Sequence, residues 1–313
     1  MHSDLQIFEF ILNRMDRGED CALVTIIDME GTGPRPLGAH MAVSSRGERL
    51  GHLTSGCLEE AVAEDALSAI KTNKNTVISY GENSRFLDFR LPCGGSLTFY
   101  IHVQPDRKLI ADSVEKLRRR LPFTLAFDAN CNDISFSEEA SDGPENSAGR
   151  LLRHYHPPIR FTMVGLGPEL QTMARVTVAA GYDTVVFSPD EDLRHECAAL
   201  DIPFHHLKSD RLDRNLLDDP WTAFVFLFHD LEREAPLLKS VLAGRSFYIG
   251  ALGSRKTHEA RIGGLMSLDI DQESLSRIHG PIGLIPAARD PAVLAISTVA
   301  EVIECFRKAK ANE

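Results

Sequence analysis

The sequence lacks the features that mark membrane, secreted or nucleic-acid-binding proteins. No apolar run is long enough to cross a bilayer, and the first residues lack the basic and apolar segments of a secretion signal. There are only 34 Lys and Arg against 45 Asp and Glu, and the net charge of -11 argues against nucleic acid or an anionic membrane as a partner. None of the six cysteines forms a Cys-x-x-Cys pair, which argues against a zinc finger or a thioredoxin-type motif. We therefore expect a cytoplasmic protein with reduced thiols.

The length of 313 residues predicts about two domains, each with a core that needs no disulfide or structural metal. Residues 1–136 are expected to form a mixed α+β domain, whose first helix begins at a capping box made by Ser3 and Gln6. The polar, acidic residues 137–157 are expected to form a linker. Residues 158–313 form the second domain, with a last helix, 290–310, that could pack on the first domain.

The second domain has the alternation of a Rossmann-like fold. A buried strand enters the turn Gly165-x-Gly167, and a helix follows; further strands and helices alternate to the end of the chain. This pattern predicts a doubly wound parallel sheet. Leu170 stands in place of the third glycine of a dinucleotide motif, and Ser188 stands where an acid would hold the ribose. NAD(P) binding is therefore not expected, although the helix start after Gly167 could hold a phosphate.

Cys57 lies in a glycine hinge at the start of a predicted helix. The apolar positions Leu58, Val62, Ala66 and Ile70 have helical spacing, which places Cys57 at or beside the helix N-terminus. Free N–H groups there favour a thiolate, and Gly56 leaves room for a ligand. Glu59 and Glu60 oppose ionisation of the thiol. The alternative is a buried, inert cysteine.

Two further residues of the first domain are candidates for ligand binding. Cys93 lies in a second glycine turn, Pro92-Cys93-Gly94-Gly95, and could converge with Cys57 on one ligand. The two cysteines are 36 residues apart, which is no local metal signature. Arg35 lies in a loop stiffened by glycine and proline, which suits the recognition of phosphate or carboxylate. A solvent-exposed loop arginine is the alternative.

In the second domain, candidate residues follow the predicted strands. His229 closes a buried strand, at the end where such sheets bind ligands, and is either a ligand or acid/base group or a structural histidine. Ser254 is a predicted helix cap, with Arg255 and Lys256 just inside the helix. This arrangement can seat an anion, although cations near a helix N-terminus are intrinsically unfavourable.

Taken together, these motifs resemble the XdhC/CoxI family of maturation factors for molybdenum hydroxylases. Ser55 replaces the first glycine of the usual Gly-Gly-Cys, and Glu234 replaces an aspartate that often follows the His-Asp pair. The motifs that carry the resemblance are Gly33-Pro34-Arg35-Pro36-Leu37-Gly38, Ser55-Gly56-Cys57-Leu58-Glu59, Pro92-Cys93-Gly94-Gly95, Gly165-x-Gly167, His229-Asp230, Tyr248-Ile249-Gly250-Ala251-Leu252-Gly253-Ser254-Arg255, Pro281-Ile282-Gly283-Leu284 and Ser297-Thr298-Val299-Ala300-Glu301.

The resemblance implies a homodimeric chaperone that binds molybdenum cofactor and protects it while a cysteine desulfurase provides the sulfido ligand. It would then deliver the cofactor to a xanthine dehydrogenase or aldehyde oxidoreductase. Cys57 or Cys93 would approach the molybdenum, and Arg35 the pterin or phosphate. Residues at the glycine turns and strand ends complete the cofactor-binding set, which adds Gly56, Gly94, Gly165, Gly167, His229, Ser254 and Arg255.

Two other classes of function stay open. The first is an NAD(P)-dependent oxidoreductase that uses the Rossmann-like domain. The second is a structural partner of a hydroxylase, in which the cysteines would be dispensable. An accessory or insertion factor is favoured over a turnover enzyme, and no catalytic residue is assigned.

Overall fold

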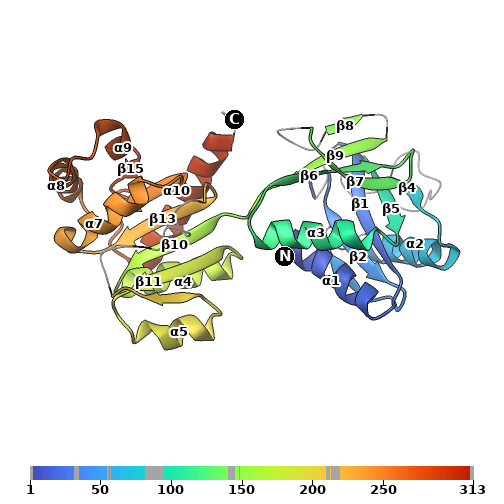
Figure 1. Ribbon diagram of the computed structural model, residues 1–313, viewed down its shortest axis with the longest axis horizontal. Helices are drawn as coiled ribbons and strands as arrows, with labels where there is room; N and C mark the ends of the chain where they lie inside the picture. The colour runs from blue at the N-terminus through green and yellow to red at the C-terminus, as the bar shows by residue number, and fades with distance from the viewer. Residues whose placement is uncertain are drawn as a thin grey trace. The chain divides into compact units, whose positions relative to one another are not determined.

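A computed structural model describes residues 3–31, 35–54, 56, 58–81, 95–139, 145–147, 149–208, 212 and 219–310 (Figure 1). The chain divides into two compact units, Met1–Pro157 and Pro158–Glu313. Each unit has two apolar cores of its own. Among the described helices, none is both long and apolar enough to cross a bilayer.

The described residues of the first unit form two antiparallel sheets and three helices. Its elements are α1 (Asp4–Asp16), β1 (Cys21–Glu30), β2 (His40–Ser44), β3 (Arg49–Gly51), α2 (Glu59–Thr72), β4 (Thr76–Gly81), β5 (Ser96–Val103), α3 (Arg107–Arg118), β6 (Phe123–Asp128), β7 (Asp133–Ser137), β8 (Glu145–Ser147) and β9 (Arg150–Tyr155). The larger sheet has the order β3-β2-β1-β5-β4 and the smaller β7-β6-β9-β8.

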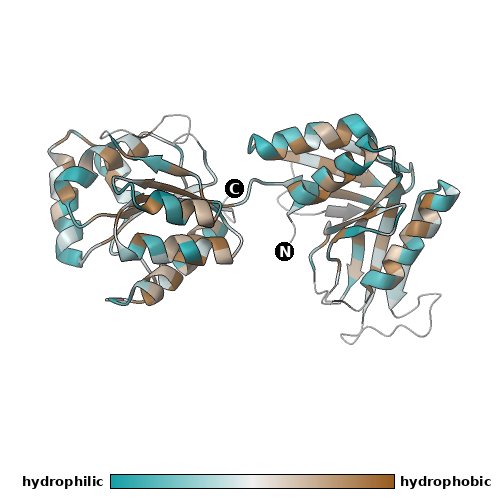
Figure 2. Cartoon of the chain, turned by 90° about the horizontal axis from the view of Figure 1, so that it is seen from below, coloured by the Kyte–Doolittle hydropathy of each residue, from teal (hydrophilic) through white to brown (hydrophobic). Residues whose placement is uncertain are grey.

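Strand β1 lies at the centre of the larger sheet and is covered on both faces. Its first seven residues are all buried, as expected for a strand between two cores. Ala22, Val24 and Ile26 face the apolar side of α2. Cys21, Leu23 and Ile27 face the core that contains α1, α3 and the smaller sheet. In Figure 2 the helices show apolar residues on one side and polar residues on the other, as this packing requires.

The stretch predicted as a linker is partly strand. Residues 150–155 form β9, which pairs with β6 from Asp128↔Arg150 to Phe123↔Tyr155, and residues 145–147 form β8. Strand β9 is difficult to recognise in the sequence for two reasons. A polar stretch precedes it, and only Leu151, Leu152 and Tyr155 of its six residues are buried. The described part of the chain thus continues the first unit to its boundary at Pro157.

The second unit is a parallel sheet with helices on both faces. Its elements are β10 (Arg160–Gly165), α4 (Pro168–Ala179), β11 (Asp183–Ser188), α5 (Leu193–Ala199), β12 (Phe204–His206), β13 (Thr222–Leu227), α7 (Leu231–Leu242), β14 (Tyr248–Ala251), α8 (Arg255–Met266), α9 (Gln272–Ser276), β15 (Ile278–His279) and α10 (Pro291–Lys310). The strand order is β12-β11-β10-β13-β14-β15, and the order reverses between β10 and β13. This confirms the predicted mixed α/β fold with a Rossmann-like sheet.

The two faces of the parallel sheet are covered by different helices. One core contains residues of α4, α5 and α10, and the other contains residues of α7, α8 and α9. Leu294, Ala295, Val299 and Val302 fix the inner side of α10 in the first of these cores. The last helix is therefore part of the second unit.

Candidate functional site

The loop before α2 carries the first of the predicted site motifs. Cys57 lies outside the described residues, as do Ser55, Cys93 and Gly94, but its neighbours are placed. Leu58 is the N-cap residue of α2, so the helix begins just after Cys57. Gly56 is exposed and has a φ of +101°, and apart from its chain neighbours no atom of the described residues lies within 4 Å of the place where a Cβ would be. The position before Cys57 is therefore open to a ligand.

Hydrogen bonds to Glu59 stabilise this loop. Its carboxylate accepts a hydrogen bond from Thr54 N (2.8 Å) and a short one from the Thr54 hydroxyl. The Thr54 hydroxyl oxygen in turn accepts a bond from Leu58 N (3.3 Å). Burial alone would raise the pKa of Glu59, but the bonds from Thr54 outweigh it and hold that pKa below its usual value. The sequence indicates only that Glu59 is an acid in the first turn of a helix. Its hydrogen bonds to Thr54 depend on the geometry of the loop, which the sequence does not contain.

A pocket of about 330 Å³ opens beside the same loop, within the size range of small-molecule sites. It contains groups of both charge signs, and Arg49 forms an ion pair with Glu60 (2.6 Å). Gly51 lines the pocket and cannot be replaced by a larger residue without strain, because a Cβ there would lie 2.5 Å from the His40 carbonyl oxygen. The residues that line the pocket are Arg49, Gly51, His52, Gly56, Glu59 and Glu60.

The loop that carries Arg35 is held at its far end by a buried polar network. Arg35 is partly exposed, and a Cβ on Gly38 would lie 2.6 Å from Cδ of Arg153. Arg153 donates to Asp4 (2.7 Å) and lies over the Tyr155 ring. Gly38 is therefore needed because an arginine stem packs on it.

The same network continues through His40. Its Nε2 is 2.5 Å from the Tyr155 hydroxyl, and its Nδ1 is 2.9 Å from the Thr25 hydroxyl. Burial and the nearby Arg153 cation hold the pKa of His40 well below its ordinary value, so the ring is neutral. The sequence pattern did not indicate this network, because Arg153 and Tyr155 belong to the stretch interpreted as a linker.

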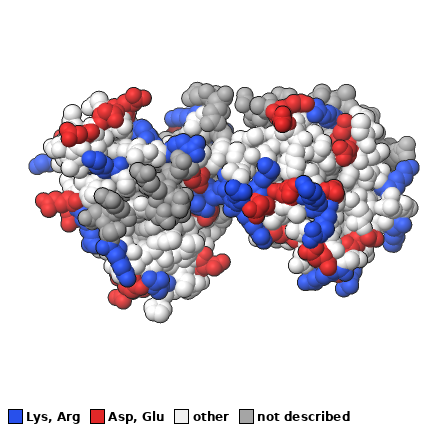
Figure 3. Space-filling model, in the orientation of Figure 1, with Lys and Arg blue, Asp and Glu red and all other residues white. Residues whose placement is uncertain are grey.

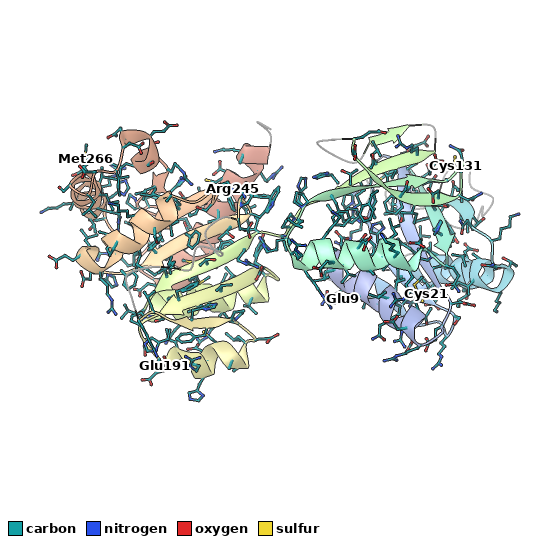
Figure 4. The ribbon with its side chains drawn as sticks, viewed as in Figure 1. Glu9, Cys21, Cys131, Glu191, Arg245 and Met266 are labelled. Carbon is teal, nitrogen blue, oxygen red and sulfur yellow. The ribbon has the colours of Figure 1, made fainter. Side chains whose placement is uncertain are left out.

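The four described cysteines lie in other surroundings than those expected for Cys57. Cys21, Cys131, Cys197 and Cys305 are free thiols. Cys21 is buried inside the first unit, where burial raises the pKa of its thiol to about 12, whereas Cys131 lies at the surface between β6 and β7 (Figure 4). Within the described ranges, no three His, Cys, Asp or Glu side chains are grouped to hold a metal ion.

In the second unit, the predicted residues gather at the carboxyl edge of the parallel sheet. Gly165 ends β10, and a Cβ there would lie 2.4 Å from the Leu227 carbonyl oxygen at the end of β13. Gly167 is the N-cap residue of α4, with a φ of +92°. Leu170 is buried in the core, so the position of the third motif glycine is used for packing.

His229 and Ser254 lie at the ends of neighbouring strands. His229 is exposed after β13, and the adjacent Asp230 caps α7 by accepting from Glu232 N (3.0 Å) and Arg233 N (3.3 Å). Ser254 is the predicted N-cap of α8 and accepts from Thr257 N (3.1 Å). Arg255 is exposed in the first turn of α8. This edge therefore combines the N-termini of α4, α7 and α8 with a histidine and an arginine.

A buried ion pair supports the turn before α8. Arg261 Nε donates to Glu234 (2.6 Å), Arg261 Nη2 donates to the Leu252 carbonyl oxygen (2.6 Å), and both side chains are at most 2% exposed. Burial raises the pKa of Glu234, and the Arg261 cation offsets this only in part. Glu234, which stood out in the sequence as a departure from the family motif, thus has a structural partner.

The last three motifs of the sequence are joined by hydrogen bonds to one carboxylate, that of Glu301. Gly250 gives space to the Tyr248 ring, because a Cβ there would lie 2.5 Å from it. The Tyr248 hydroxyl donates to Glu301 of α10 (2.9 Å), and Gly283 N donates to the same carboxylate (2.5 Å). Burial would raise the pKa of Glu301, but hydrogen bonds from His279, Gly283 and Tyr248 hold it below its usual value. These motifs position residues 281–285 on α10.

Charges on the surface of the first unit are mixed. Over α1 and α3, basic and acidic side chains alternate (Figure 3), with ion pairs that join Arg107 to Asp16, Lys108 to Asp112 and Arg118 to Glu9. On the face shown, the net negative charge is therefore not collected into one acidic surface.

Comparison with known proteins gives two family matches. The XdhC and CoxI family model matches residues 15–81, and the XdhC Rossmann domain model matches residues 161–302. The chain is 32% identical over 296 residues to the molybdenum cofactor insertion chaperone PaoD of Escherichia coli K12, covering 95% of this chain and 86% of that protein.

Two more distant relatives have similar length. A Bacillus subtilis protein described as a probable xanthine dehydrogenase subunit is 23% identical, over 93% of this chain and 94% of its own. The crystal structure of a protein described as a xanthine dehydrogenase from Bacillus halodurans superimposes with a TM-score of 0.74 at 20% identity, covering 98% of this chain and 96% of that one. At this identity the match shows that the fold is shared.

Proposed function

The chain belongs to the XdhC and CoxI family, and on this premise we propose that it is a molybdenum cofactor chaperone. It binds the cofactor as cargo, protects it while a cysteine desulfurase supplies the sulfido ligand, and delivers it to a xanthine dehydrogenase or aldehyde oxidoreductase. The observation that carries the proposal is the 32% identity, over 95% of the chain, to a protein named as a molybdenum cofactor insertion chaperone.

The chemistry of the cargo supports a role for the first unit. Molybdenum cofactor offers a metal that accepts thiolate, a polar pterin and a phosphate. We assign Cys57 as the principal thiol, with Cys93 as a second. The support for Cys57 comes from its neighbours in the sequence: Gly56 has open space at its Cβ position and lines the pocket that contains Arg49 and Glu60, and Leu58 is the N-cap residue of α2. Arg35 is assigned to the pterin or the phosphate.

The carboxyl edge of the parallel sheet is the second part of the proposal. Helix N-termini bind phosphate through their free N–H groups, and α4 and α8 both begin at this edge. We assign the phosphate-binding role here to Gly165, Gly167, Ser254 and Arg255, with His229 beside them. The protein is further proposed to act as a homodimer.

The most direct test is to analyse the purified protein for its cargo. Acid oxidation should release a fluorescent pterin, and elemental analysis should find molybdenum in proportion to it. The same protein should activate a molybdenum hydroxylase that has been made without its cofactor. Protein that carries neither pterin nor molybdenum after expression in a cofactor-producing host, and that activates no hydroxylase, would contradict the proposal.

The alternative, an NAD(P)-dependent oxidoreductase, has less support. Leu170 is buried in the core at the position of the third motif glycine, which in dinucleotide-binding folds lets the helix pack closely on the strand. Ser188 is also buried at the end of β11, and its hydroxyl accepts a bond from Asp190 N (3.1 Å). At the position that holds the ribose in dinucleotide-binding folds, this chain therefore has a buried serine whose hydroxyl binds the backbone two residues later.

A further inference from the structure

An apolar patch lies where the segment after β15 meets the outer side of α10. Four large side chains form it: Leu284, Ile285, Val293 and Ile296, which are 53, 50, 39 and 60% exposed. Scattered single apolar residues are normal on a protein surface, but a contiguous group marks an interaction site. The patch is not needed for the core, because the opposite side of α10 already fills that core.

Hydrogen bonds hold this patch in place. Ile285 N donates to the Ser297 hydroxyl (2.7 Å), and Leu284 N donates to the Ser297 carbonyl oxygen (3.4 Å). Gly283 N, one residue earlier, is bound to Glu301 (2.5 Å). Leu284 and Ile285 are therefore fastened beside α10 in the folded chain. A surface that is already ordered loses less conformational entropy when it binds.

The outer side of α10 continues the patch as a helical stripe. Val293, Ile296 and Ala300 are exposed and are spaced three and four residues apart, which places them on one side of the helix. No ionisable residue occurs between Pro291 and Ala300. Charged residues flank the stripe, with Arg289 and Asp290 before it and Glu304 and Arg307 after it, while the Glu301 carboxylate accepts hydrogen bonds from Tyr248 and Gly283.

We propose that this patch is the interface of the homodimer, with α10 of one copy packed on α10 of a second copy around a two-fold axis. The inference rests on the homodimer put forward under the proposed function. A two-fold interface brings the same surface together from both copies, so that surface must be compatible with itself. An apolar surface meets this condition, because it places no charge opposite its own copy.

The net charge of the chain points to the same occupant. Two copies with a formal charge of -11 each repel one another, and they approach at least cost through an uncharged surface. Each end of the stripe carries an acidic and a basic residue, so an antiparallel crossing brings both charge signs together at each end. The two-fold axis also doubles the patch, which removes eight large apolar side chains from water in each dimer.

The test is the mass of the full-length protein by size-exclusion chromatography with light scattering. The wild type should have the mass of a dimer, and Ile296→Arg and Ile285→Arg should each shift it to a monomer at the same concentration. Met266→Arg is the matched control. Met266 is 54% exposed at the end of α8, within the same unit (Figure 4), and its replacement should leave the dimer intact. Circular dichroism and melting curves should show that all variants are folded.

Each other result overturns the inference. A wild type that is monomeric over a broad concentration range rules out both the homodimer and this interface. A dimer that persists in folded Ile296→Arg and Ile285→Arg places the interface elsewhere, and loss of hydroxylase activation in those dimers would assign the patch to the hydroxylase. Pterin and molybdenum content, measured on the same samples, reports on the chaperone function separately.

Discussion

Glycines in the motif-bearing segments serve two different purposes. At Gly165 and Gly250 a neighbouring atom already occupies the space of a side chain, at 2.4 and 2.5 Å. These glycines are required by packing inside the protein. At Gly56 that space is open, although the φ of +101° disfavours other residues. Among these three, only Gly56 leaves room for a molecule from outside, and its neighbour in the sequence is Cys57.

Replacement of Cys57 by serine should separate folding from cofactor retention. Serine keeps the size of the side chain but removes the soft sulfur ligand. The melting temperature should therefore stay close to that of the wild type, while bound pterin and molybdenum fall by about tenfold or more, as is typical when a metal site loses affinity. Cys93→Ser should have a similar or smaller effect.

Cys21→Ser and Cys305→Ser are the controls for this experiment. Cys21 is buried in β1 and Cys305 is partly buried in α10, so both changes should affect packing and leave cargo content per folded molecule unchanged. Wild-type stoichiometry in Cys57→Ser, together with full activation of the hydroxylase, would show that Cys57 is a structural residue.

Glu59 should make the stability of the first unit depend on acid pH. Its pKa is lower in the folded chain than the ordinary 4.5, so its contribution is complete above that value and is lost as the pH falls through the lowered folded-state pKa. Glu59→Gln weakens the charge-assisted bonds to Thr54 and should cost about 1–2 kcal/mol at pH 7. Denaturant unfolding between pH 3 and pH 7 measures this. The difference between variant and wild type should narrow toward pH 3, and a constant difference would contradict the role of the carboxylate.

At the scale of elements, helices α7 and α8 are joined by the buried pair of Glu234 and Arg261. Removing one partner leaves a buried charge alone, so Glu234→Leu or Arg261→Met should each destabilise the protein by about 3–5 kcal/mol. The double variant removes both charges and should recover most of this loss. Urea unfolding of the four proteins gives the coupling energy directly. Additive losses in the double variant would mean that the two side chains act independently.

The elements with strong periodic patterns could be predicted from the sequence. The apolar spacing from Leu58 to Ile70 correctly predicted a helix, and the capping box of Ser3 and Gln6 begins α1 as expected. The Rossmann-like sheet followed from alternating strands and helices. These signals are local, because each depends on residues within a few positions of one another.

The parts that could not be predicted depend on contacts between distant segments. Strand β9 is stabilised by pairing with β6, and its sequence has weak alternation after a polar stretch. The role of Arg153 follows from its contacts with Asp4 and Gly38, more than a hundred residues earlier. Glu234 looked like a departure from a motif until Arg261 was placed beside it. Patterns along the chain do not contain such pairings.

At the scale of the whole molecule, the protein has the sheet order of a dinucleotide-binding fold, but we expect that it does not bind dinucleotides. Calorimetric titration with NAD(H) and NADP(H) should show weak or undetectable binding, because Leu170 and Ser188 serve packing and capping at the positions concerned. The family assignment does not depend on the result. Saturable binding at micromolar concentration, with turnover of a hydroxy or carbonyl substrate, would instead support the oxidoreductase alternative.

The ion pair between Asp4 and Arg153 brings the beginning of the first unit next to its end. Residue 4 is the first of α1 and residue 153 lies in β9, so this unit closes on itself before the chain continues at Pro158. A short linker should therefore be able to join the two ends, with new termini opened between β6 and β7 at Cys131. Such a circular permutant of residues 1–157 should fold cooperatively as a separate protein. It could then be studied, with its cysteine motifs, apart from the nucleotide-type fold that follows it.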